Sequence, residues 1–69
     1  MSGGKAPLRL RGVMRLGERG PWLEEADGTV WRIEAGEDLA DYADRPVQIE
    51  GWQRGASHLE LLWIGSVAG

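Results

Sequence analysis

The side chains that could carry catalysis are few in this sequence and stand apart from one another. The one histidine, His58, lies beside a turn, and the three serines have no base near them. Glu24 and Glu25 are neighbours on a strand-like run, so their carboxylates point to opposite faces and cannot act together on one substrate. General acid–base and nucleophilic chemistry need groups that lie together. We therefore expect no catalytic residue and no enzymatic activity.

Ligands for a metal ion or a cofactor are also sparse. The chain has no cysteine, which excludes disulfides and thiolate metal sites. The acidic run of Glu37, Asp38, Asp41 and Asp44 lacks the spacing of a calcium-binding loop. Asp38 and Asp41 could weakly hold a hard cation, and the alternative is a solvated acidic face. The glycines form no phosphate-binding motif, and the sequence predicts no metal and no cofactor.

Five strand-like runs must position whatever surface the protein uses. They are Leu8–Leu16, Trp22–Glu25, Thr29–Glu34, Pro46–Arg54 and His58–Ile64, with one short helix-like segment at Glu37–Ala43. The order β-β-β-α-β-β predicts an all-β protein with one short helix, a small five-stranded OB-type barrel. An SH3-like barrel keeps the strand count but places its short helix between the last two strands.

Alternation within the runs predicts one core face, to which Leu8 and Leu16 also belong. Gly12 interrupts the first run where a barrel strand bends, and Asp27-Gly28 predicts a tight hairpin. The helix is expected to plug one barrel end through Leu39 and Tyr42. The predicted core comprises Leu10, Met14, Leu23, Trp31, Ile33, Val47, Ile49, Leu59 and Leu61.

Length and composition bound the protein further. A chain of 69 residues has room for one domain. We expect a barrel over residues 7–65, a disordered tail over 1–6 and a C-terminal tail over 66–69. No apolar run reaches the roughly 18 residues that a membrane span requires. The first residues lack the apolar stretch of a secretory signal, which predicts a cytoplasmic protein.

The net charge of −3 is distributed unevenly along the chain. Residues 1–19 carry +4 and residues 20–50 carry −7. The net negative charge of the chain argues against tight, sequence-independent binding of nucleic acid, because such binding needs a dominant cationic field. Pairing of opposite charges between neighbouring strands explains the asymmetry, and a local anion site on the basic first strand is the alternative.

The fourth strand carries a sequence pattern of its own. The run Asp44–Trp52 resembles the pattern G-(R/K)-x-V-x-V-x-G in a family of small uncharacterised bacterial OB-fold-like domains. Gly12-Val13, Trp22–Glu24, Trp31–Ile33 and Leu59–Ile64 fall at equivalent places, so the resemblance covers roughly residues 8–65. It implies the fold and no established activity. Asp44 departs from the pattern, because it stands at the usual glycine position.

Exposed aromatic and basic residues point to a contact surface. Trp52 alternates with Val47 and Ile49, and so faces outward; the alternative is that it folds over the barrel end or packs under the N-terminal tail. Leu61–Ile64 is apolar on both faces and indicates a bulge or a covered strand. Whether Trp22 and Trp63 face the core or the solvent is left open. The fourth strand of an OB barrel lies between the first and the fifth, so their outward residues form one predicted binding patch: Arg9, Arg11, Val13, Arg15, Trp52, Arg54, His58, Leu62 and Trp63.

Two functions fit such a patch. The first is a protein-interaction module that forms a homodimer or docks on a larger protein, with no membrane partner. The alternative is a module that binds single-stranded nucleic acid by stacking bases on tryptophan. The usual OB binding face, strands two and three, carries Glu24, Glu25 and Glu34, which would repel phosphates. The acidic charge therefore favours the interaction module.

Overall fold

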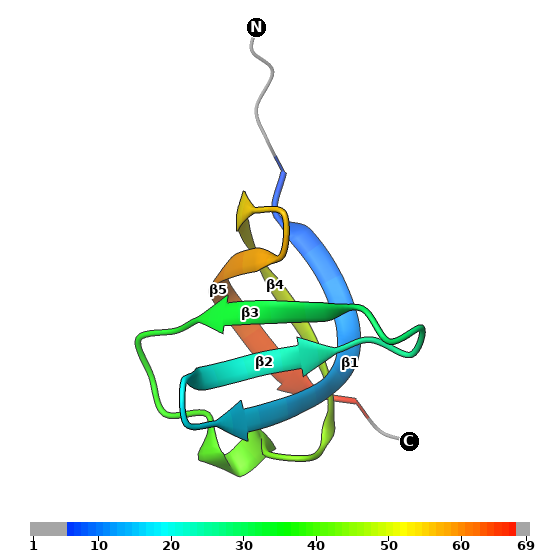
Figure 1. Cartoon of the computed structure of the whole chain (residues 1–69), viewed down its shortest axis with the longest axis vertical. Helices are drawn as coiled ribbons and strands as arrows, with labels where there is room; N and C mark the ends of the chain where they lie inside the picture. Colours follow the sequence, from blue (N-terminus) through cyan, green and yellow to red (C-terminus); the bar gives the residue numbers. More distant parts are fainter. Residues whose placement is uncertain (1–5, 68–69) are drawn as a thin grey trace, which may run out of the picture.

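The protein folds as one closed sheet, for which the computed structural model describes residues 6–67. Its elements are β1 (Leu8–Gly17), β2 (Gly20–Glu24), β3 (Val30–Glu34), the 3-10 turn η1 (Ala40–Tyr42), β4 (Pro46–Gly55) and β5 (His58–Ser66). The strands follow the order β1-β2-β3-β5-β4, and β4 pairs with β1 to close the barrel (Figure 1). β3 and β5 are parallel, and the other pairs are antiparallel. The predicted fold class is confirmed. Residues 1–5 and 68–69 of the predicted tails lie outside the described residues.

β1 is long because it pairs with two strands in succession. Leu8–Val13 pair with β4, and Val13–Gly17 pair with β2. At the change of partner, a Cβ on Gly12 would lie 2.3 Å from the carbonyl oxygen of Glu24. Only glycine allows the two backbones to approach so closely. Gly12 therefore marks the predicted bend.

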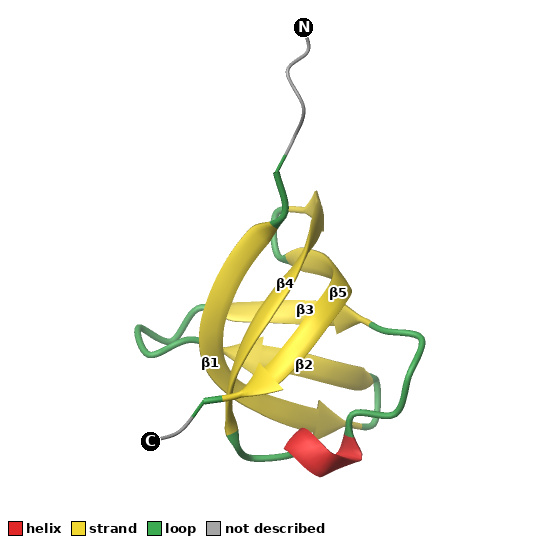
Figure 2. Ribbon diagram, turned by 180° about the vertical axis from the view of Figure 1, so that it is seen from behind, coloured by secondary structure: helices red, strands yellow, loops and turns green. Residues whose placement is uncertain are grey.

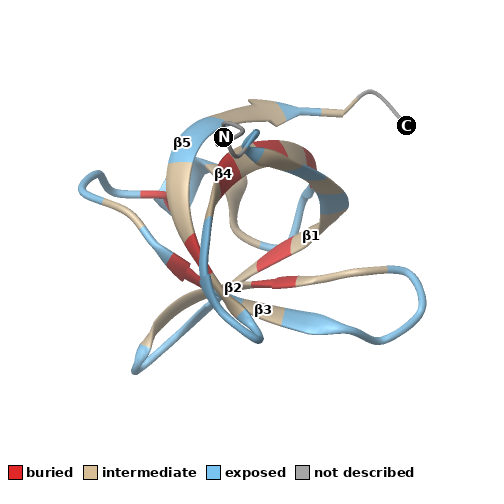
Figure 3. Ribbon diagram, turned by 90° about the horizontal axis from the view of Figure 1, so that it is seen from above, coloured by how far each residue is buried: buried red, intermediate tan, exposed pale blue. Residues whose placement is uncertain are grey.

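The core lies between the inward faces of the strands (Figure 3). Its buried members are Met14, Leu23, Ile33, Leu39, Val47, Ile49 and Leu59. Three residues predicted for the core, Leu10, Trp31 and Leu61, are only partly buried and pack against it. The indole of Trp31 donates a hydrogen bond of 2.6 Å to Glu25, so its polar edge stays at the rim of the barrel.

Leu16 also departs from its predicted place on the core face. Its side chain is 42% exposed. It pairs with Pro21 near the end of the hairpin between β1 and β2. The alternation of the strand persists there, but no opposite wall of the barrel covers the residue.

The predicted helix over Glu37–Ala43 is a single 3-10 turn. Asp38, just before the N-cap residue Leu39, accepts a hydrogen bond of 2.9 Å from the amide of Ala40. The amide of Tyr42 donates to the carbonyl of Leu39 at 2.9 Å. A segment this short cannot offset the cost of helix nucleation. Leu39 is buried and Tyr42 partly buried, so the predicted plug of one barrel end is confirmed (Figure 2). Residues 6–67 contain no helix long and apolar enough to cross a membrane.

Asp44, at the glycine position of the family pattern, adopts a backbone conformation that favours glycine. Its φ is 61°, in the left-handed region. The Asp44 amide donates to the carbonyl of Met14 at 2.7 Å, and its carboxylate lies 2.8 Å from Nη1 of Arg15. These contacts stabilise Asp44 in a backbone conformation that a glycine would adopt without strain.

Candidate functional site

A bulge in β5 decides which of its apolar residues face outward. The register between β4 and β5 shifts after the pair Glu50–Trp63, because the next pair is Gly51–Leu61. Leu62 is therefore the extra residue. Leu61 turns to the core, whereas Leu62 and Trp63 are 53% and 51% exposed. Because of this bulge Trp63 faces the solvent and not the core, a choice that the sequence left open.

Trp63 lies flat along the outside of its own strand. A Cβ on Gly65 would be 2.6 Å from Cη2 of Trp63, so the indole covers the glycine. A larger residue at position 65 would push the ring away from the sheet. The outer side of β1, β4 and β5, which Figure 2 turns toward the viewer, thus carries a supported and half-exposed aromatic ring.

The charges around this ring are paired within the sheet. Arg9 lies opposite Glu50 on β4 and makes an ion pair of 2.8 Å with it. Arg11 lies opposite Gln48 and donates to its Oε1 at 3.0 Å. Glu50 in turn pairs with Trp63 across β4 and β5. We call the surface formed by Arg9, Arg11, Gln48, Glu50, Leu62 and Trp63 the Trp63 face.

Trp52 and Arg54 lie at one end of this surface. Trp52 is partly buried and lines a hollow with Ala6 and Leu8. Arg54 forms an ion pair with Glu60, the residue opposite Trp52 on β5. These two members of the predicted patch therefore extend the Trp63 face toward the start of β1.

The other members of the predicted patch lie elsewhere. Val13 pairs with Pro46 on one side and with Glu24 on the other. Arg15 contacts Glu24 at 3.4 Å and Asp44 at 2.8 Å, and hydrogen bonds to Asp44 and then to Glu24 raise its pKa. His58 pairs with Arg32 of β3, and its Nε2 lies 3.6 Å from Glu34. Arg11, Val13 and Arg15 nevertheless line one hollow, so the predicted patch stays continuous along β1 while its neighbouring strands change.

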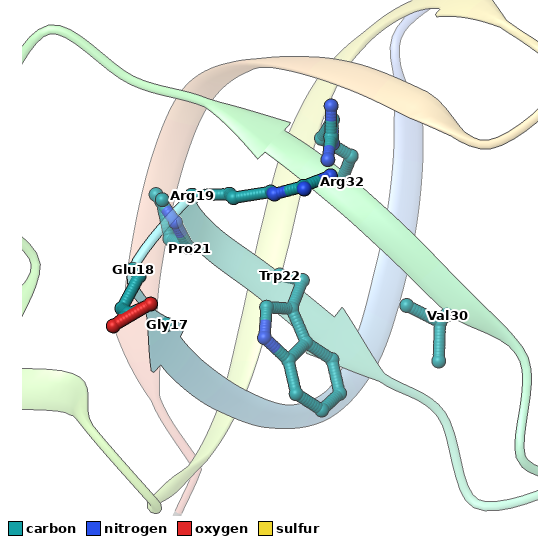
Figure 4. Close-up of a pocket in the computed structure, with 8 residues that line it drawn as sticks. Gly17, Glu18, Arg19, Pro21, Trp22, Val30 and Arg32 are labelled. Atoms are coloured by element: carbon teal, nitrogen blue, oxygen red, sulfur yellow. The ribbon is translucent and has the colours of Figure 1, made fainter.

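A second candidate surface lies on the opposite side of the barrel. A groove of about 500 Å³ is lined by the turn Gly17–Pro21 and by Trp22, Val30 and Arg32 (Figure 4). Trp22 and Arg32 are paired across β2 and β3. A Cβ on Gly17 would lie 3.4 Å from Nε1 of Trp22, an ordinary contact, so the indole lies near this glycine without requiring it. We call this surface the Trp22 groove.

The Trp22 groove holds two cations without acidic partners. Within residues 6–67, no carboxylate lies within salt-bridge distance of Arg19 or Arg32. In Figure 4 the side chain of Arg19 extends from the turn across β2 toward Arg32. The carboxylate of Glu18, which also lines the groove, lies on the other side of the turn in this view.

This groove was not predicted from the sequence. The carboxylates on strands two and three can be counted in the sequence, but their hydrogen-bond donors depend on the folded structure. A usable signal was present, because the Asp27-Gly28 hairpin places Trp22 opposite Arg32. Arg19 had no such signal, since its direction depends on the turn between β1 and β2.

Residues 11–67 match the model of a family described as "Protein of unknown function (DUF5818)". The chain belongs to this family. The match confirms the resemblance to a domain of unknown function, and it includes both Trp22 and Trp63. No curated protein and no solved structure matches the chain. The function of the family is unknown, so the two surfaces are the basis for inferring the function of this DUF5818 member.

Proposed function

We propose that this protein is a non-catalytic interaction module that forms a homodimer through the Trp63 face. The observation that supports the proposal is the flat indole of Trp63, 51% exposed and seated on Gly65, beside Leu62, which is 53% exposed. Exposed aromatic residues held in a fixed orientation are the usual anchors of protein interfaces. A fixed ring also loses little conformational entropy on binding.

The charge of this face favours a protein over a polyanion. Arg9 is neutralised by Glu50, and Arg54 by Glu60. Arg11 donates to a neutral amide and is the one surplus cation of the face. A phosphate backbone would have to compete with carboxylates for these guanidinium groups. The alternative function, binding of single-stranded nucleic acid, therefore finds little support on this surface.

A second copy of the chain is the partner that fits this surface best. A two-fold axis through the Trp63 face would bring Leu62 and Trp63 of both copies together, and each copy would cover the apolar pair of the other. The paired charges would form a rim that is nearly neutral in both copies, without strong repulsion. Arg11 then belongs at the rim, where solvent screens it.

The size of the surface is compatible with this arrangement. A stable interface buries about 800 Å² on each partner. The chain exposes 4740 Å² in total. The interface would therefore bury about one-sixth of the exposed surface. The face spans three of the five strands of the barrel, which is more than this share.

Sedimentation equilibrium tests the proposal. The wild type should report about twice its 7.6 kDa mass at micromolar concentration. Trp63→Glu places a charge at the centre of the interface and should give a folded monomer, because an unpaired buried charge is costly. Trp52→Glu, at the end of the same surface, should also shift the equilibrium toward monomer.

Trp22→Glu is the matched control, because it makes the same change in the other candidate surface. This variant should remain a dimer, and circular dichroism should show that all three variants are folded. A wild type that is monomeric at several hundred micromolar would contradict the proposal. So would a Trp63→Glu variant that remains a dimer.

A further inference from the structure

We propose that the Trp22 groove binds a nucleotide, with the base on the indole of Trp22 and the phosphate between Arg19 and Arg32. This site is separate from the proposed dimer interface, since it lies across β2 and β3 rather than β4 and β5. Three features favour such a ligand: two guanidinium groups without acidic partners, nearby carboxylates that have other partners, and an indole in the same groove.

The two arginines of the groove favour an anionic ligand. Arg19 and Arg32 line one groove, and neither has a carboxylate within salt-bridge distance among residues 6–67. Two guanidinium groups in one small groove repel each other when no anion lies between them. Arginine presents planar donors that match the oxygens of a phosphate. The groove is therefore complementary to a phosphate group.

The carboxylates that seemed to oppose phosphate binding are engaged elsewhere. Glu24 contacts Arg15 at 3.4 Å, and Glu25 accepts the 2.6 Å hydrogen bond from the indole of Trp31. Glu34 lies 3.6 Å from Nε2 of His58. Of these three acids only Glu24 faces a guanidinium group, so local pairing lowers the repulsion of a phosphate at that residue, and Glu18 is the one acid that lines the groove.

The ring of Trp22 supplies the apolar part of the site. Its indole nitrogen rests near Gly17, and Val30, which is 44% exposed, lines the same groove. An aromatic side chain beside arginines is the combination that stacks a base and holds its phosphate. An acidic peptide would satisfy the arginines but would leave the indole without a planar partner.

The same chemistry is present in a free nucleotide and in a single strand. The net charge of −3 predicts weak binding of either at physiological salt, with a dissociation constant above about 10 μM. Thymidine monophosphate and a short oligothymidylate are therefore the two probes. Preference for the oligonucleotide by tenfold or more would assign the site to a strand, and equal affinity would assign it to a free nucleotide.

The indole resonances of the four tryptophans in a ¹H–¹⁵N spectrum show where each probe binds. The Trp22 signal should move on titration while the Trp63 signal stays in place. Arg19→Ala and Arg32→Ala should each weaken binding about tenfold, the effect of one lost charged hydrogen bond. If two phosphates of the oligonucleotide are held, a tenfold rise in salt should weaken its binding about 25-fold.

Two controls separate this site from general electrostatics. Arg9→Ala removes the same charge from the Trp63 face and should leave binding unchanged. Glu18→Gln should strengthen binding, because it removes the acid that lines the groove. Movement of the Trp63 signal instead, wild-type affinity in both Arg19→Ala and Arg32→Ala, or no binding of either probe at millimolar concentration would overturn the inference. Each of these results leaves the dimer measurement intact.

Discussion

The Trp63 face and the Trp22 groove each place a tryptophan near a glycine, but in different electrostatic surroundings. A Cβ on Gly65 would lie 2.6 Å from the ring of Trp63, so that indole covers its glycine, whereas a Cβ on Gly17 would lie 3.4 Å from Nε1 of Trp22, an ordinary contact. Beside Trp63, Arg9 is paired with an acid of the same face. Beside Trp22, the acids pair with other residues, and Arg19 and Arg32 have no acidic partner among the described residues.

The difference teaches that exposure of an aromatic residue does not by itself indicate a class of partner. A ring among self-neutralised charges suits a partner of similar surface, such as a second copy. A ring among unpaired guanidinium groups suits a planar anion. Three predictions test this distinction, from the largest expected effect to the smallest.

The largest effect should come from Gly51, which sits at the bulge that turns Trp63 outward. A Cβ there would lie 2.3 Å from the carbonyl oxygen of Glu60 and 2.9 Å from Cδ2 of Leu59. Gly51→Ala should lower the free energy of unfolding by about 3 kcal/mol, since backbone atoms cannot move aside cheaply. Urea denaturation measures the change.

Gly55→Ala, at the end of the same strand, is the control for Gly51→Ala. The nearest atom to its new Cβ would be Cβ of His58 at 3.7 Å, an ordinary contact. This variant should change the free energy of unfolding by less than about 1 kcal/mol. Equal urea midpoints for Gly51→Ala and the wild type would show that the bulge does not depend on the glycine.

The second prediction concerns a substitution that should make the Trp63 face bind a nucleotide as the Trp22 groove is proposed to do. Glu50→Gln removes the acidic partner of Arg9, 2.8 Å away, and leaves a free guanidinium group on β1, with position 50 of β4 between it and Trp63. We expect the Trp63 indole signal to respond to thymidine monophosphate about tenfold more strongly than in the wild type. The free energy of unfolding should fall by less than about 1 kcal/mol, because the pair is exposed.

Glu60→Gln removes the acidic partner of Arg54 and is the comparison for Glu50→Gln, because Glu60 is paired with Trp52 whereas Glu50 is paired with Trp63. It should leave the Trp63 signal unresponsive. If Glu50→Gln behaves in the same way, pairing of charges is not what separates the two surfaces.

The smallest effect concerns the hairpin that aligns Trp22 with Arg32. The amide of Thr29 donates to Oδ1 of Asp27 at 2.9 Å and lowers the pKa of that carboxyl below 3.8. The folded state therefore binds this proton less readily than the unfolded state does. The stabilisation is complete above pH 3.8 and is lost as the pH falls through the lower pKa of the folded state.

Asp27→Asn should remove this part of the pH dependence while keeping an oxygen that accepts the same hydrogen bond. The measurement is the free energy of unfolding in urea between about pH 2 and pH 6. A slope as steep as that of the wild type below pH 3.8 would show that other carboxyl groups account for the acid sensitivity.

Much of the architecture could be predicted from local patterns. Alternation identified six of the seven buried residues as strand core, and the spacing of Leu39 and Tyr42 supplied the seventh as the plug of the barrel end. The hairpin at Asp27-Gly28 and the bend at Gly12 follow from residues with special backbone requirements. The helix was overestimated because its acidic start resembles a helix N-terminus, whereas its length allows one turn.

The surfaces were less predictable, because a strand pattern gives the face of a residue but not its neighbours across the sheet. The outward parity of Arg9, Arg11 and Arg15 was correct, yet the first two face β4 and the third contacts Glu24 of β2 and Asp44. The strand changes partner at Gly12 and Val13, so residues that the sequence places on one face meet different neighbours on either side of this point.

By itself, then, the sequence determined which residues alternate, where the chain turns and how many strands close the barrel, because these depend on local sterics and on the burial of one face. Only the tertiary structure decided the bulge at Leu62, the orientation of Trp63 over Gly65 and the separation of paired from unpaired arginines. These features depend on the register between strands distant in sequence. A shift of one residue in that register changes which side of the sheet every side chain faces.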